Sequence, residues 1–237
     1  DYRRGTDPIY DDNVMTIFPR MWNGTKRSYT STYEQYIDKS KMIPVSVKKS
    51  DGSVETILKP TFMQNLKFFI GYQCNHMYWR YFMWNFVGRQ NDIQGHGELE
   101  NGNWISGIKF IDEARLGKQT DLPKSMTNAG RTTFYFLPLI LGLIGLFYQI
   151  KKDIKNSWVV FLLFFMTGLA IVIYLNQTPY QPRERDYAYA GSFYAFCIWI
   201  GFGVLGIVEL LQKLLKNKMI AAVVAFVLCL SVPVVMA

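Results

Sequence analysis

Four long apolar runs in the second half of the chain constrain its fold most. They cover residues 132–150, 157–175, 188–211 and 219–237. Each run approaches or exceeds the about 20 residues that an α-helix needs to cross a bilayer. Because backbone polar groups find no water in lipid, these runs are expected to be helices. The sequence therefore predicts a mainly α fold, a polytopic transmembrane helix bundle.

The chain is much more polar before residue 132 than after it. Hydrophobic residues make up 50% of the sequence, but this average conceals a first half rich in Lys, Arg, Asp, Asn and Gly. We therefore divide the chain into a mixed external segment, 1–131, and a transmembrane domain, 132–237. The chain starts with Asp and stops inside an apolar run, so we expect it to be an internal fragment of a longer protein.

Glycines recur in the first and third predicted spans. Small residues let two helix backbones approach closely in a membrane. We expect helix–helix contacts at these positions, which are Gly142, Gly145, Gly201, Gly203 and Gly206.

Lysines in two short loops predict the orientation of the helices. Residues 151–156 and 212–218 each contain three Lys. The positive-inside rule places both loops in the cytoplasm. The loop at 176–187 and the whole segment 1–131 are then expected to lie together on the outer side of the membrane.

A short hairpin is predicted within residues 43–60. Asp51-Gly52 is a typical two-residue hairpin turn, and alternating Val and Ile residues flank it.

Residues 62–87 are rich in Tyr and Trp and form a separate feature of the external segment. Aromatic rings with polar tips suit the headgroup region of a membrane. We predict an aromatic interfacial helix that lies on the outer membrane surface or docks against the bundle, with a fifth span as the alternative. Six side chains are expected to share one face of this helix: Leu66, Phe69, Ile70, Met77, Tyr81 and Trp84.

The stretch "RERD", residues 183–186, places four charges between two apolar runs. Arg183 and Arg185 can form charge-assisted, bidentate hydrogen bonds, and the family resemblance given below implies a lipid phosphate as their ligand. The alternative is that the four charged side chains pair with one another and anchor the helix, an arrangement that contributes little energy. Tyr187 follows directly and is a further candidate contact.

The aromatic run is followed by a loop in which polar side chains alternate with glycine. Aromatic faces stack on sugar rings while amide, carboxylate and guanidinium groups bind hydroxyls, so this region suits substrate binding; the alternative is a solvated loop that caps a helix. The candidate residues are Trp79, Arg80, Arg89, Asn91 and Asp92. No metal site is predicted from ligand spacing, and Asp92 or Glu98 could contribute to a divalent-metal cofactor site.

Two blocks, "YWRYFMWNFVGRQNDIQG" (78–95) and "NQTPYQPRERDYAYAGSFYAF" (176–196), resemble a family of bacterial membrane proteins called domain of unknown function 2723. That family is related to protein O-mannosyltransferases. The resemblance extends to "GNWISGIKFIDEARLG" and "FYFLPLILGLIGL". It implies a location in the bacterial inner membrane, with residues 1–131 and the 176–187 loop in the periplasm.

The resemblance also implies an integral-membrane glycosyltransferase. Such an enzyme moves a sugar from a polyprenyl-phosphate donor to an extracytoplasmic protein or glycan acceptor. Its catalytic carboxylate is expected upstream of this fragment, so no residue here receives that role. The expected partners are the donor, the acceptor and the lipid bilayer. No nucleic-acid partner is expected. The alternative functions are a transporter or flippase and a non-enzymatic scaffold of an envelope assembly complex.

Overall fold

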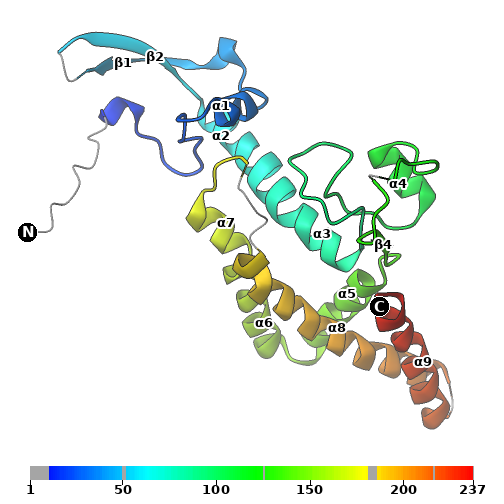
Figure 1. The fold of residues 1–237 in the computed structure, drawn as a ribbon. Helices are drawn as coiled ribbons and strands as arrows, with labels where there is room; N and C mark the ends of the chain where they lie inside the picture. The colour runs from blue at the N-terminus through cyan, green and yellow to red at the C-terminus, as the bar shows by residue number, and fades with distance from the viewer. Residues whose placement is uncertain (1–10, 50–51, 125, 181–185, 216, 237) are drawn as a thin grey trace, which may run out of the picture. The chain divides into compact units, whose positions relative to one another are not determined.

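The computed structural model of the chain is mainly helical (Figure 1) and describes residues 11–49, 52–124, 126–180, 186–215 and 217–236. It contains two compact units, Asp1–Gln73 with Asn176–Gln181, and Cys74–Leu175 with Pro182–Ala237. The sequence-based boundary at residue 131 lies inside the second unit.

The first unit contains a β-hairpin and short helices. Its elements are η1 (Asp12–Val14), α1 (Arg27–Glu34), η2 (Lys39–Lys41), β1 (Ile43–Lys48), β2 (Val54–Lys59) and α2 (Phe62–Phe68). Strands β1 and β2 pair antiparallel with Lys48 opposite Val54, which confirms the predicted hairpin. Gly52 has a φ of 82°, a conformation that glycine adopts without strain.

A second stretch of chain, Asn176–Gln181, belongs to the first unit. The indole Nε1 of Trp22 donates to the carbonyl oxygen of Asn176 at 2.9 Å. The amide Nε2 of Gln73 donates to the carbonyl oxygen of Gln177 at 2.7 Å. Residues far apart in the sequence therefore close this unit.

The predicted aromatic helix over 62–87 is helical but does not have one regular period. Helix α2 leads into a π-helix, η3 (Phe69–Trp79), and then into α3 (Arg80–Phe86). A π-helix bonds i to i+5, so it rotates the positions that follow onto a new face. Of the six residues predicted to share one face, only Tyr81 is buried.

The second unit contains the longest helices. Its remaining elements are β3 (Gly88–Arg89), α4 (Lys109–Leu116), β4 (Thr132–Thr133), α5 (Leu137–Lys152), α6 (Ile154–Met166), α7 (Leu169–Leu175), α8 (Asp186–Leu214) and α9 (Lys218–Met236).

Three helical stretches within the described residues are long and apolar enough to cross a membrane. They are Ile154–Leu175, Tyr187–Leu214 and Lys218–Met236, with 22, 28 and 19 residues. This agrees with the predicted membrane-spanning helices in length and composition. The first predicted span, 132–150, differs, because Thr132 and Thr133 form β4 and the helix α5 that follows has 16 residues.

Helices α5 and α8 pack side by side (Figure 1) through glycine. A Cβ atom at Gly145 would overlap the carbonyl oxygen of Trp199, and one at Gly203 would overlap the carbonyl oxygen of Leu141. A Cβ at Gly142 would overlap the ring of Phe196, and one at Gly206 would make a tight contact with Ile144 at 3.1 Å, whereas one at Gly201 would meet nothing within 4 Å. The predicted glycine contacts are confirmed at four of the five positions.

Polar contacts continue the pairing of α5 and α8 toward their C-terminal ends. The indole Nε1 of Trp199 donates to Oε1 of Gln149 at 2.8 Å. Farther along, Glu209 forms salt bridges with Lys152 at 2.8 Å and with Lys213 at 3.0 Å. Gly142 lies against Phe196, Tyr148 against Gly206, and Lys152 against Glu209, so α5 and α8 run parallel with their lysine-bearing ends at the same end of the pair.

An aromatic core joins α3 to these helices. Its buried members are Phe82, Phe86, Phe196 and Trp199. Tyr78 is fully buried nearby, and its hydroxyl lies 2.5 Å from the hydroxyl of Ser192 on α8. The second half of the predicted aromatic helix is therefore docked against other helices of the second unit.

Candidate arginine–tryptophan binding site

Three candidate residues from the sequence lie in or beside the charged loop that precedes α8. Arg183 and Arg185 lie outside the described residues. Tyr187 is in the first turn of α8 and is 80% exposed.

The other five candidates lie within or next to a loop in the second unit, residues 90–103. Side-chain amides of Gln90 and Asn91 hold this loop through hydrogen bonds to its backbone. Asn91 is fully buried; its Oδ1 accepts a hydrogen bond from the Gly102 backbone N–H at 3.0 Å, and its Nδ2 donates to the Glu100 carbonyl at 3.0 Å. The Nε2 of Gln90, also fully buried, donates to the Leu99 carbonyl at 2.7 Å. The Asn91 amide therefore holds the loop in shape.

Asp92 is exposed on the same loop, and its Oδ1 accepts a hydrogen bond from Nδ2 of Asn128. Glu98, the other carboxylate considered for a cation, accepts from the His96 backbone N–H at 2.6 Å. Within the described part of the chain, no group of three or more His, Cys, Asp or Glu side chains could hold a metal ion.

A pocket of about 380 Å³ lies beside this loop and collects cationic and aromatic side chains. Its lining residues are Asn75, His76, Trp79, Arg80, Met83, Asn103, Trp104 and Arg115. Trp79 and Arg80 are predicted site residues, and the junction of η3 with α3 places them next to each other. We call this pocket and the arginines around it the arginine–tryptophan site.

Arg80 is fixed in the wall of the pocket by backbone carbonyls. Its Nε donates to the His76 carbonyl oxygen at 3.0 Å, and its Nη1 donates to the Gly102 carbonyl oxygen. The first bond runs within the helix and the second reaches the amide-framed loop. A charged side chain held from two directions loses little conformational entropy when a ligand binds.

Arg115 reaches the same pocket from α4. Its guanidinium carbon lies 3.4 Å from the ring centre of Trp104, and its Nη1 donates to the Trp104 carbonyl oxygen at 3.1 Å. Buried Asp112 anchors α4, because its carboxylate accepts the backbone N–H groups of Ser106 and Gly107, each at 2.8 Å. Burial lowers the pKa of Arg115 and Asp112 opposes this shift, but an arginine remains protonated at neutral pH.

A second pair of arginines lies at the β3–β4 ribbon. The Arg89 guanidinium stacks 4.2 Å from the ring centre of Trp84. Arg89 is directly opposite Thr132 in the ladder, so their side chains share a face, and Arg131 precedes Thr132. Three buried polar atoms here have no hydrogen-bond partner: Nε of Arg89, Nη1 of Arg131 and Oγ1 of Thr132. Such unpaired donors are costly, and an anionic ligand could satisfy them.

Arginines outnumber carboxylates at the site, although Asp112 and Glu98 lie close enough to act on Arg115 and His76. No carboxylate among the described residues forms a salt bridge with Arg89, Arg115 or Arg131. Burial, reinforced by the charge of Arg80, lowers the pKa of His76 to about 4. His76 is therefore neutral at pH 7 and adds hydrogen-bonding capacity without charge.

The residues chosen from the sequence include Trp79, Arg80 and Arg89 of this candidate site but not Trp104, Arg115 or Arg131. The missed residues lie in separate segments and follow no common spacing. Tertiary structure alone pairs Trp104 with Arg115. A weak signal was present, because a Trp in a Gly- and Asn-rich loop is unusual unless its ring has a partner.

Comparison with known families corrects the expected resemblance. The model of a family of unknown function, DUF8416, matches residues 2–70. This family differs from domain of unknown function 2723, and no glycosyltransferase family matches, so the assignment to the 2723 family is wrong. The quoted blocks lie outside residues 2–70, and their aromatic and apolar runs have a composition that membrane helices share widely. No curated protein and no solved structure matches the chain.

Proposed function

We propose that the chain is part of an integral-membrane protein that binds a phosphorylated, sugar-bearing ligand at the arginine–tryptophan site. The observation that carries this proposal is that Arg80 and Arg115 line one pocket together with Trp79 and Trp104. Guanidinium groups bind phosphate oxygens in bidentate fashion, while indole faces stack on the C–H face of a sugar. The buried Nε of Arg89 and Nη1 of Arg131 have no hydrogen-bond partner, and a nearby anion would supply one.

Transfer of the sugar from a polyprenyl-phosphate donor to an extracytoplasmic protein or glycan is the reaction we propose. When the glycosidic bond breaks, the phosphate leaving group gains negative charge. Fixed arginines would stabilise that charge more in the transition state than in the ground state. We assign no catalytic base within this chain. The bacterial inner membrane, with the site on its periplasmic side, is the proposed location.

Binding can be measured on the full chain in lipid nanodiscs, with a short-chain polyprenyl-phosphate hexose as the titrant. We expect Arg115→Gln to weaken binding at least about tenfold, the loss of a charge-assisted hydrogen bond. Arg115→Lys keeps the charge but not the stacking on Trp104, and should weaken binding less. Lys118→Gln is the matched control, because Lys118 is exposed just beyond α4 and pairs with Asp121.

The proposal fails if Arg115→Gln and Arg80→Gln variants that remain folded bind the donor as tightly as the unaltered protein. Binding without sugar transfer to any acceptor would retain the site but favour a transporter or scaffold over a glycosyltransferase.

A further inference from the structure

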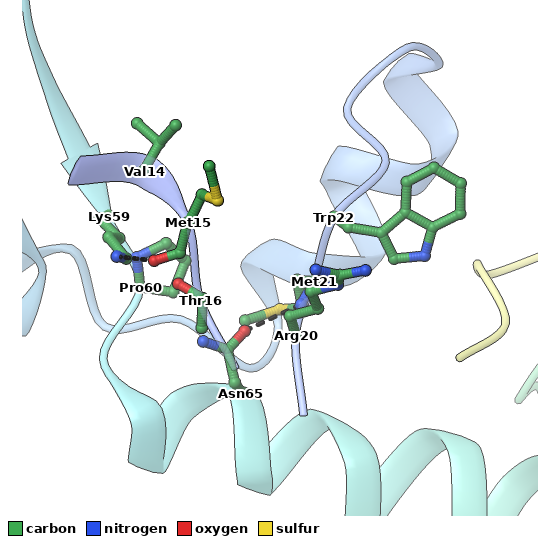
Figure 2. Close-up of a pocket in the computed structure, with 9 residues that line it drawn as sticks. All are labelled: Val14, Met15, Thr16, Arg20, Met21, Trp22, Lys59, Pro60 and Asn65. Carbon is green, nitrogen blue, oxygen red and sulfur yellow. Dashed lines mark hydrogen bonds between the residues drawn. The ribbon is translucent and has the colours of Figure 1, made fainter. Parts of the chain in front are cut away.

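The first unit contains a pocket of about 340 Å³ that is independent of the arginine–tryptophan site (Figure 2). It lies among residues 14–22, the end of β2 and the start of α2. Its lining residues are Val14, Met15, Thr16, Arg20, Met21, Trp22, Lys59, Pro60 and Asn65. All of them lie within the segment, 2–70, that the family model matches.

Two buried or half-buried side chains hold the wall of this pocket at both ends, as Figure 2 shows. The Lys59 ammonium donates to the carbonyl oxygens of Asn13 and Met15, at 3.0 and 2.5 Å. At the other end, Oδ1 of Asn65 accepts from the Met21 backbone N–H at 2.9 Å, and Asn65 is only 3% exposed. The pocket is therefore formed before any ligand arrives.

The wall combines apolar surface with one available cation. Val14, Met15, Met21 and Pro60 contribute hydrocarbon and thioether atoms. Arg20 is exposed and forms no hydrogen bond or salt bridge with a described residue, so its guanidinium is available to an anion. A ligand that suits this pocket has an anionic group next to an apolar one.

The rim of the pocket exposes an unusual amount of apolar surface for such a short segment. Met15 and Trp22 are each 57% exposed and Ile17 is 77% exposed. Large apolar side chains that cluster on a surface mark interaction sites, including contacts with membranes. Trp and Arg together are typical of the lipid headgroup region, and the described part of the chain contains three helices long and apolar enough to span a membrane.

We infer that this pocket binds the headgroup of an anionic phospholipid. Arg20 contacts the lipid phosphate, and Met15 and Trp22 pack against the glycerol and the upper acyl chain. An anionic membrane surface attracts each nearby cation with about 1 kcal/mol. This site holds the first unit to lipid through its own residues and does not depend on the proposed sugar-transfer function.

Trp22 provides the readout. The full chain is placed in nanodiscs with phospholipids brominated near the headgroup, and Trp fluorescence is compared between the unaltered protein and Trp22→Phe. The difference between them reports Trp22 alone. We expect bromolipid to quench this difference signal, and more strongly in anionic phosphatidylglycerol than in zwitterionic phosphatidylcholine.

Arg20→Gln should reduce the preference for anionic lipid about fivefold, the effect of one cation near a charged surface. Arg27→Gln, an exposed arginine on α1, is the matched control and should leave the preference unchanged. Trp158→Phe controls for the spans, because Trp158 is 61% exposed on α6 and its quenching should not depend on headgroup charge.

An unquenched Trp22 signal, or equal quenching in both lipids, would overturn the inference. So would complete relief of quenching by excess inorganic phosphate, because the site would then bind free phosphate rather than lipid. If the donor binds normally at the arginine–tryptophan site but Trp22 is not quenched, only the lipid-binding inference fails and the proposed function stands.

Discussion

At the residue scale, we expect His76 to make the stability of the second unit depend on pH. It lines the pocket from η3, and its backbone carbonyl holds Arg80. Burial and the charge of Arg80 lower its pKa from 6.5 to about 4, the charge of Glu98 acts in the opposite direction, and His96 adds to the lowering. An unfolded chain carries no such constraint, so the two states bind protons over different pH ranges.

We expect the stability of the second unit to fall as the pH drops from about 6.5 to about 4. In that window the unfolded chain gains a proton on His76 before the folded chain does, which favours unfolding. Above pH 6.5 the residue is neutral in both states and contributes no pH dependence. Thermal unfolding of the full chain in detergent between pH 4 and 8 measures the slope.

His76→Asn should flatten that slope, whereas His96→Asn, at an exposed position, should not. An unchanged slope in His76→Asn would show that other groups titrate in this range.

Local residue chemistry allowed only part of the site to be predicted. Trp79 and Arg80 are neighbours in sequence, so one short segment was enough to identify both. Asn91 fits a sugar ligand equally well by type, but a buried amide in a tight loop is needed for the loop's own carbonyls and N–H groups. Sequence shows which groups can form hydrogen bonds and not which partner they find.

At the element scale, the contact between α5 and α8 depends on glycines, which have no side chain to keep the two helices apart. Gly145 and Gly203 let the two backbones approach, and Trp199 completes the contact by reaching Gln149. In a membrane, where lipid is as apolar as the helices, close packing and interhelical hydrogen bonds drive association. The apolar pattern of the spans therefore predicts helices, and the glycines within them predict which faces meet.

Gly145→Ala should lower the stability of the helix pair by about 1–3 kcal/mol, the usual result of forcing extra volume into a packed contact. Gly201→Ala is the control, because a Cβ there meets nothing within 4 Å. It should be neutral or slightly stabilising, since Ala favours helix more than Gly does. Apparent melting temperatures in detergent compare the two, and equal effects would contradict the packing described above.

Sequence patterns did not predict two features, the start of α5 and the π-helix η3. Thr132 and Thr133 continue the apolar run of α5 in composition, but they pair with Gly88 and Arg89 instead of entering the helix. In η3 the i to i+5 pattern changes which side chains are buried, and a reading based on 3.6 residues per turn misassigns them. Both effects depend on partners elsewhere in the fold.

At the scale of the whole molecule, the parallel course of α5 and α8 limits how the chain can cross a membrane. Two parallel helices must be joined by a return, and α6 with α7 lies between them in sequence. Glu209 holds Lys152 and Lys213 together, so the two lysine-rich loops belong to one end of the helix pair. This agrees with the positive-inside rule, which assigns both loops to one side.

We expect cysteines introduced at Lys152 and Lys213 to behave alike. In a background where Cys74, Cys197 and Cys229 are replaced by Ala, neither should react with an impermeant thiol reagent added outside intact cells. Both should react after permeabilisation, and Arg183→Cys should react without it. Opposite labelling of the two lysine positions would contradict the parallel arrangement, and reversed labelling of all three would invert the orientation.

Residues 176–180 belong to the first unit, although the second unit contains the chain on both sides of them, 74–175 and 182–237. The chain leaves the first unit after residue 73 and returns to it at residue 176. There, the side chains of Trp22 and Gln73 donate hydrogen bonds to the carbonyl oxygens of Asn176 and Gln177. A polypeptide ending at residue 73 would contain the whole family-matched segment but would leave the Trp22 indole N–H and the Gln73 amide without their partners. The folded first unit therefore needs residues 176–180 in addition to the family-matched segment.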